Sequence, residues 1–128
     1  FPPVAVGRRG LFVAREEDQF FHTLGLPLRI LLLPGHTADS IGLLDETSGN
    51  LFCGDAAMNA IISCKKHTIW MDDAQAFGAS WDAMIAAKQR RIYPAHGNPV
   101  SPELLRRHRH FMEEKKLIPM KGRREARR

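Results

Sequence analysis

An apolar stretch that ends abruptly at a histidine is the feature that most constrains this chain. Leu31-Leu32-Leu33 is continuously apolar, and Pro34-Gly35 breaks regular structure immediately before His36. Apolar runs bounded by turn residues are typical of buried strands, and a Pro-Gly pair marks a turn. The pattern therefore predicts a core strand over residues 28 to 33 that presents His36 at its end. A lone histidine in such a loop is more often a half-exposed loop residue than a ligand.

The same arrangement occurs twice more along the chain. Leu51-Phe52-Cys53 leads through Gly54 to Asp55, and a short strand over residues 91 to 95 leads to His96. Imidazole and carboxylate groups together suit zinc, iron or manganese, and an adjacent glycine lets backbone and ligand approach closely. The three candidate metal ligands are therefore His36, Asp55 and His96. Their distances along the sequence do not by themselves show that they meet.

Helices are predicted from capping residues and apolar spacing. From Asp72 or Asp73 onwards, apolar residues recur at intervals of three and four, which is typical of an amphipathic helix. Gly78 weakens the middle of this pattern, and Ser80 is a candidate N-cap for a second helix over residues 81 to 90. Ser101-Pro102-Glu103 predicts another helix start, with a capping serine, a proline at the first position and an acid near the positive end of the dipole.

The remaining segments favour strands and turns. Residues 40 to 45 are predicted to form a strand, and the polar loop over residues 46 to 50 turns the chain back. Residues 11 to 14 are expected to form a short strand on which residues 20 to 24 pair. Residues 56 to 62 are expected to form a helical turn.

The basic charge of the chain is confined to its end. The net charge is +5, but residues 115 to 128 hold seven basic residues and one acidic residue, which leaves 12 basic and 13 acidic residues elsewhere. Such blocks are usually solvated, so we expect one domain over residues 1 to 114 and a disordered tail over 115 to 128. Nucleic acid is an unlikely partner on this distribution, and no apolar run approaches the roughly 20 residues of a membrane span.

The two cysteines form no CxxC pair and no disulfide-rich pattern. Cys53 lies inside an apolar run and is expected to be a small core residue, while Cys64 lies in a polar segment. Two such thiols are typical of a reducing compartment. The expected location is therefore the cytoplasm.

Three motifs together resemble a known family. Gly35-His36-Thr37-Ala38-Asp39-Ser40-Ile41, Leu51-Phe52-Cys53-Gly54-Asp55 and Ile92-Tyr93-Pro94-Ala95-His96-Gly97 are similar to the last three metal-binding motifs of the metallo-β-lactamase superfamily, in the family's order. The likeness runs from about Glu16 to the helix that begins at Ser101, and is to hydrolases of the hydroxyacylglutathione hydrolase type. The resemblance implies an α/β fold: the C-terminal half of an αββα sandwich, with a mixed sheet and flanking helices.

The resemblance also implies roles for individual residues. His36 would bind a first metal, Asp55 would bridge two metals, and His96 would bind the second. The family's site holds two zinc ions, with iron or manganese as alternatives. Metal-bound water is acidified to a pKa of about 7, so metal-bound hydroxide would be the nucleophile. Thr37 and Ser40 would fix the loop around the ligands, and Tyr93 would either face the substrate or pack in the core.

One motif of the family is absent from the chain. The sequence contains no HxHxDH, and its other histidines, His22, His67, His108 and His110, do not form that pattern. Because the missing motif supplies four ligands, the three that remain are too few for a closed tetrahedral site. We therefore expect weak metal binding, a site that can stand empty, and no activity from this chain alone.

Three functional hypotheses follow. In the first, the parent protein is a metal-dependent hydrolase of a thioester, lactone or related ester, and this chain needs the missing N-terminal half. In the second, the chain is a non-catalytic interaction or remnant domain that dimerises, because half a sandwich exposes an apolar sheet face. In the third, it derives from the redox or nuclease members of the superfamily.

Overall fold

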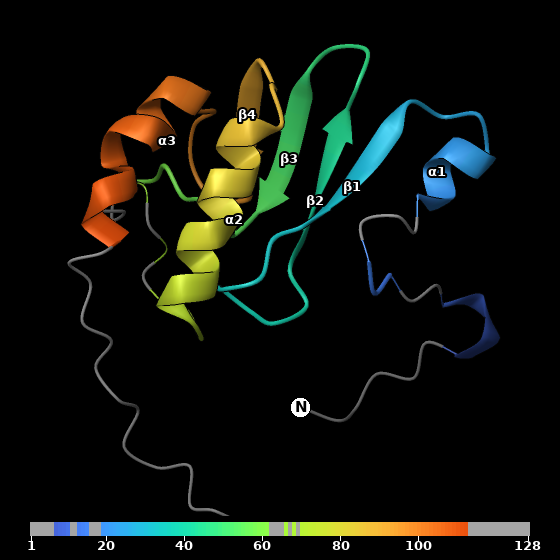
Figure 1. The fold of residues 1–128 in the computed structure, drawn as a ribbon, viewed down its shortest axis with the longest axis horizontal. Coiled ribbons are helices and arrows are strands. Elements are labelled where there is room, and N and C mark those ends of the chain that lie inside the picture. The colour runs from blue at the N-terminus through green and yellow to red at the C-terminus, as the bar shows by residue number, and fades with distance from the viewer. Residues whose placement is uncertain are drawn as a thin grey trace, which may run out of the picture.

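The computed structural model describes residues 7–10, 13–15, 19–61, 66, 68 and 70–112. Figure 1 shows the arrangement of its helices and strands. In chain order they are η1 (Gly7–Arg9), α1 (Phe20–Thr23), β1 (Leu28–Leu32), β2 (Ile41–Asp45), β3 (Asn50–Gly54), α2 (Ala74–Ala86), β4 (Arg91–Pro94), α3 (Pro102–His108) and η2 (Arg109–Met112).

The four strands form one mixed sheet in the order β1-β2-β3-β4. The first three strands are antiparallel neighbours, whereas β4 runs parallel to β3. Two adjacent parallel strands need a long crossover connection, and here α2 lies within it. The predicted strands over residues 28 to 33, 40 to 45, 51 to 53 and 91 to 95 are therefore confirmed to within one or two residues.

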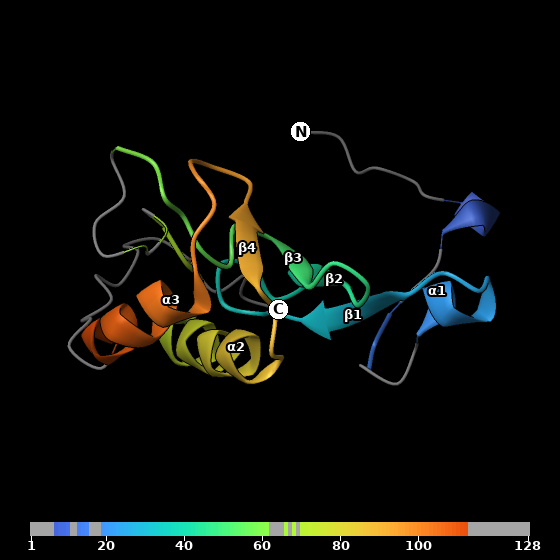
Figure 2. The same cartoon turned by 90° about the horizontal axis from the view of Figure 1, so that it is seen from above.

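Helices α2 and α3 cover one face of the sheet, as Figure 2 shows from above. Leu44, Leu51 and Ile92 are side by side in the strand register and point into this layer. The buried aromatic residues of α2, Phe77 and Trp81, pack against them. The largest buried side chains of this cluster are Trp81, Phe77, Leu33, Leu51, Met84, Ile92 and Leu105.

The opposite face of the sheet carries apolar side chains that remain partly exposed. Successive residues of a strand point to opposite faces, so the alternate positions Leu32, Ile41, Leu43, Phe52 and Tyr93 share what we call the open face. Ile41 is 49% exposed and Phe52 is 50% exposed. The rings of Phe52 and Tyr93 stack, with centroids 5.3 Å apart. The β3–β4 part of this face therefore presents an aromatic pair to its surroundings.

Both edges of the sheet have hydrogen-bonding partners. The side-chain amide of Gln19 donates to the Ile30 carbonyl at 3.1 Å and accepts from the Ile30 amide at 2.8 Å. At the other edge, Ile92 in β4 and Val100 exchange two backbone hydrogen bonds of 2.9 Å. Unpaired strand edges are ready templates for added strands. The contacts of Gln19 and Val100 occupy part of each edge of this sheet.

Helix α2 is continuous, and the predicted break within it is wrong. Asp73 caps its N-terminus by accepting from the amides of residues 75 and 76. Gly78 lies inside the helix, where a Cβ atom would be only 3.2 Å from the guanidinium of Arg109, so the glycine leaves room for that side chain. Ser80 caps no helix, since its hydroxyl donates to the carbonyl of Pro34 at 2.6 Å. Tertiary contacts explain both residues better than local propensity.

Two further predictions need correction. Residues 20 to 23 form the short helix α1 and not a strand, so His22 is helical. Among the described residues from 56 to 61 the chain forms turns, bends and an isolated bridge from Asn59 to Gly97 instead of a helical turn. Other predictions fall outside the described residues: those for residues 11 and 12, Cys64, His67 and the basic tail.

The predicted helix start at Ser101 is confirmed. The Ser101 hydroxyl accepts from the amide of Leu104, and Pro102 occupies the first turn of α3. Within the described part of the chain, no helix is long and apolar enough to cross a membrane.

Candidate metal centre

The ends of three strands meet at one side of the sheet. Because β1 and β3 are both antiparallel to β2, and β4 is parallel to β3, the C-terminal ends of β1, β3 and β4 point the same way. His36, Asp55 and His96 follow these three ends. The topology therefore brings together residues that lie up to 60 positions apart in the sequence.

The carboxylate of Asp55 lies between the two imidazoles. Its Oδ2 atom is 3.6 Å from Nε2 of His36, and its Oδ1 atom is 2.7 Å from Nδ1 of His96. An ionised carboxylate can only accept hydrogen bonds, so Nδ1 of His96 donates in the short contact. All three side chains are at least partly exposed, so a ligand can approach them from outside.

Two glycines allow the loops at these strand ends to pack tightly. A Cβ atom on Gly35 would lie 2.4 Å from the backbone of Phe77, and one on Gly97 would lie 2.1 Å from the carbonyl carbon of Asn59. Both glycines have positive φ values, which disfavour other residues. The amide of Asn59 donates to the His96 carbonyl at 3.0 Å. The loop after Asp55 is thereby joined to the loop that carries His96.

The backbone around His36 is bound to the segment that precedes α2. The amide of Asp72 donates to the carbonyls of Gly35, at 2.8 Å, and of His36, at 3.2 Å. The His36 side chain also reaches this segment, because its Nδ1 lies 2.9 Å from the carbonyl oxygen of Trp70. Sequence reasoning missed this segment, whose composition gives no distinctive signal apart from the capping aspartate.

The hydroxyls of Thr37 and Ser40 contact each other across the loop. Their oxygen atoms are 2.7 Å apart, and the Thr37 amide donates to Ser40 Oγ at 3.3 Å. A hydrogen bond from the Thr37 side chain holds the pKa of Asp39 below its usual value. These bonds close the turn between His36 and β2. Tyr93 lies away from this turn, stacked on Phe52 in the open face.

Cys53 is a core residue, as predicted. It is 1% exposed, and burial raises the pKa of its thiol to about 12. Metals bind the thiolate and not the thiol, so this pKa leaves Cys53 protonated at neutral pH although it is two residues from Asp55. The other described histidines lie elsewhere: His22 contacts Glu46, His108 donates to the Leu104 carbonyl, and His110 packs on Phe111.

The donors fit a metal in type but not in number. Two imidazoles and a carboxylate are ligands that suit zinc, iron or manganese. The described residues contain no group of three or more His, Cys, Asp or Glu side chains arranged to hold a metal ion. The contacts among His36, Asp55 and His96 are pairwise and run through Asp55. A complete metal site therefore needs donors from outside the described residues.

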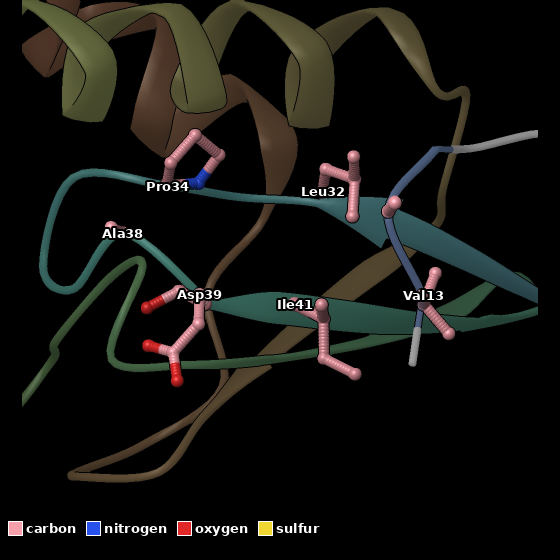
Figure 3. Close-up of a pocket in the computed structure, with 8 residues that line it drawn as sticks. Val13, Leu32, Pro34, Ala38, Asp39 and Ile41 are labelled. Carbon is pink, nitrogen blue, oxygen red and sulfur yellow. The ribbon is translucent and has the colours of Figure 1, made fainter. Parts of the chain in front are cut away.

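An apolar pocket of about 530 Å³ lies beside the loop that joins β1 to β2 and carries His36, over the β1–β2 end of the open face. Figure 3 shows Val13 lying across Leu32 and Ile41, with Pro34 and Ala38 toward the His36 loop and Asp39 pointing outward. The short N-terminal segment thus covers part of the open face without filling the space beneath it.

Curated proteins resemble part of the chain in sequence. A β-lactamase-like protein 2 homologue of Drosophila melanogaster is 31% identical over 84 residues, which are 66% of this chain and 26% of the relative. A thioesterase of Emericella nidulans is 32% identical over 87 residues, which are 68% and 24% of the two chains. A hydroxyacylglutathione hydrolase of Thiobacillus denitrificans is 38% identical over 63 residues, which are 49% and 22%. The chain spans about a quarter of the length of these relatives.

Solved structures share the fold. A metallo-β-lactamase from Erythrobacter litoralis superposes with a TM-score of 0.59 at 25% identity, over 77% of this chain and 43% of that one. An archaeal metallo-β-lactamase superfamily protein from Sulfolobus tokodaii superposes with a TM-score of 0.56 at 24% identity, over 75% and 37%. The chain resembles the metallo-β-lactamase superfamily in both sequence and fold. Its sheet and helices form part of the superfamily's α/β fold, which confirms the predicted fold class. No protein-family model matches the chain.

Proposed function

We propose that this metallo-β-lactamase-like chain supplies three metal donors, His36, Asp55 and His96, to a metal-dependent hydrolase of a thioester, lactone or related ester. The observation that carries the proposal is the position of the Asp55 carboxylate, which has one oxygen 2.7 Å from His96 and the other 3.6 Å from His36. The relatives named as a thioesterase and a hydroxyacylglutathione hydrolase support a thioester as the substrate class.

The two oxygens of Asp55 face different histidines, an arrangement that suits a carboxylate bridging two metal ions. Zinc is the metal we propose, with iron or manganese as alternatives for the same donor types. When bound, the metal supplies Lewis acidity and a water acidic enough to react near neutral pH. Thr37 and Ser40 would hold the turn that presents His36, because their hydroxyls bond across it.

The proposal requires donors that the described residues do not provide. A closed tetrahedral zinc site has four protein ligands, whereas this chain offers one histidine on each side of a shared carboxylate. The additional donors would come from the remainder of the hydrolase, since the chain spans about a quarter of its curated relatives. On this proposal the chain alone binds metal weakly and does not turn over substrate.

Cobalt(II) titration of the chain tests the donor set directly. Cobalt is a spectroscopic substitute for zinc, and we expect weak visible absorbance that is lost in His36→Ala and His96→Ala. His110→Ala is the matched control, because that histidine packs on Phe111 away from the strand ends. Equal cobalt binding by His36→Ala and the wild-type chain would contradict the assignment.

Thioester turnover tests the enzyme claim. We expect the metal-loaded full-length protein that contains this chain to release thiol from a model S-acyl thioester, and His36→Ala to abolish the release. A metal-loaded full-length protein without activity on thioester, lactone or phosphoester substrates would rule out hydrolysis.

A second candidate function, self-association as a non-catalytic domain, is supported by the open face. Ile41 and Phe52 are about half exposed on it, while Gln19 and Val100 occupy the sheet edges. Association through the face would bury apolar area at roughly 25 cal/mol per Å². Two copies packed face to face would place their helices outside and the two sheets inside.

The oligomeric state tests the second candidate. Sedimentation equilibrium should show a dimer that the double variant Ile41→Lys/Phe52→Lys converts to a monomer. Leu24→Lys is the matched control, since Leu24 is also exposed but lies next to α1. A wild-type chain that is monomeric at millimolar concentration excludes the dimer.

The cytoplasm is the compartment we propose for the protein. Cys53 is a free, buried thiol, and a free thiol persists most readily in a reducing environment.

A further inference from the structure

One backbone carbonyl, that of Trp70, receives two side-chain donors. Nδ1 of His36 lies 2.9 Å from this oxygen, and the hydroxyl of Thr68 donates to it at 2.6 Å. A carbonyl oxygen can only accept, so the proton of a neutral His36 ring is on Nδ1. Nε2 then carries the lone pair and faces Asp55.

The other neutral tautomer of His36, with its proton on Nε2, also has an acceptor nearby, the Asp55 carboxylate. With its proton on Nε2, the His36 ring would point an N–H group toward the Asp55 carboxylate, which attracts it. The two acceptors differ in distance: the Trp70 carbonyl is within hydrogen-bonding range at 2.9 Å, while the carboxylate is outside it at 3.6 Å. The tautomer of His36 therefore depends on the carbonyl staying where it is.

Thr68 is placed to hold that carbonyl. Its side chain is 2% exposed, so its hydroxyl has little access to water and benefits from a protein acceptor. A carbonyl has two lone pairs, and the Thr68 bond uses one of them to fix the direction of the other toward His36. The Trp70 ring adds a second constraint, because it meets the His36 ring edge-on at 89° with centroids 5.2 Å apart.

We propose that Thr68 is a positioning residue, which acts through the Trp70 carbonyl to keep His36 in the tautomer with Nδ1 protonated and Nε2 free. The inference rests on the proposed function in one respect: the tautomer matters for chemistry only if Nε2 of His36 binds metal. Outer partners of metal-binding histidines commonly fix the tautomer in this way. Here the fixing group is itself held by a buried hydroxyl.

The test is a nitrogen-15 NMR measurement on the metal-free chain. Long-range proton–nitrogen correlations at pH 8.5, well above the usual histidine pKa of about 6.5, distinguish the two tautomers ring by ring. We expect the wild-type His36 ring to be protonated on Nδ1, Thr68→Val to shift it toward Nε2, and Thr68→Ser to restore it. His96 should keep its signature in all three proteins, because its Nδ1 is bonded to Asp55 and the Thr68 hydroxyl is bonded to the Trp70 carbonyl.

The outcomes separate the inference from the proposed function. The inference is overturned if the His36 ring of Thr68→Val keeps its proton on Nδ1. It is also overturned if the wild-type His36 ring carries its proton on Nε2, and this second result does not depend on the variant folding. In the cobalt titration, Thr68→Val should bind about 10- to 100-fold more weakly than the wild-type chain. A wild-type chain that shows the expected tautomer but binds no metal contradicts the metal site and leaves the role of Thr68 supported.

Discussion

The Oδ1 atom of Asp55 and the Nδ1 atom of His96 are 2.7 Å apart, although 41 residues separate them in the sequence. The contact forms because β3 and β4 are parallel neighbours whose C-terminal ends lie together. Asp55 also approaches His36 with its other oxygen. The carboxylate is thus the group through which the two histidines are connected.

Replacing this carboxylate by an amide should impair the site without unfolding the chain. Asp55→Asn is expected to weaken cobalt(II) binding by at least about 10- to 100-fold, because the loss of even an outer partner of a ligand commonly costs that much. The circular dichroism spectrum should be unchanged. Glu103→Gln, in the first turn of α3, is the control. Unaltered cobalt affinity in Asp55→Asn would remove Asp55 from the ligand set.

A methyl group at Gly35 should destabilise the whole fold. Its Cβ atom would lie 2.4 Å from the backbone of Phe77, and φ at this position is +136°. We expect Gly35→Ala to lower the free energy of unfolding by about 3 kcal/mol or more. Gly25→Ala is the matched control, because φ is also positive there but no atom lies within 4 Å; we expect a loss of about 1 kcal/mol. Urea denaturation that gives equal losses would disprove the clash.

Trp81 joins α2 to the loop that follows Asp55. Its indole nitrogen donates to the Ala56 carbonyl at 2.7 Å, and the side chain is fully buried. Trp81→Phe removes this bond and part of the core volume, so we expect a loss of about 2 to 4 kcal/mol in the free energy of unfolding. Trp70→Phe, at a position that is 43% exposed, should cost less than about 1 kcal/mol. The reverse order in urea denaturation would contradict this account.

Asp45 should make stability depend on acid pH. A hydrogen bond from Ser48, followed by one from the Thr47 amide, lowers the pKa of Asp45 from its usual 3.8. A carboxyl whose pKa is lower in the folded state adds stability that is present above the unfolded pKa and is lost as pH falls through the folded value. Carbon-13 NMR titration should give a midpoint below 3.8, which rises in Ser48→Ala and stays unchanged in Ser40→Ala. A wild-type midpoint at or above 3.8 would contradict the claim that the hydrogen bonds from Ser48 and Thr47 lower the pKa of Asp45.

The strands and their terminal residues could be predicted from sequence because the signals are local. Leu31-Leu32-Leu33 before Pro34-Gly35 specifies both the strand and its end, and the serine and proline at 101 and 102 specify the start of α3. The order of the three motifs also predicted the family. These features need no knowledge of what packs against them.

The failures involve residues whose roles depend on distant contacts. Gly78 weakens a helix in isolation, but in α2 it accommodates Arg109. Serine is a preferred N-cap residue, yet the hydroxyl of Ser80 donates to the carbonyl of Pro34, which is 46 residues away in the sequence. The roles of Thr68 and Trp70 at His36 could not be predicted, because a threonine and a backbone carbonyl carry no ligand signal in a sequence. Whether the three donors meet was likewise decided by topology and not by spacing.

The side-chain amide of Gln19 takes the place that a neighbouring strand would occupy beside Ile30. A side-chain amide offers N–H donors and a carbonyl acceptor at about the separation of those of a peptide group, so a single glutamine can substitute for a residue of β-sheet. At Ile30 this edge of the sheet is then covered by one removable side chain. Truncating it would expose the Ile30 peptide as a template, and sheet growth by strand addition, the first step toward fibrils, would compete with folding.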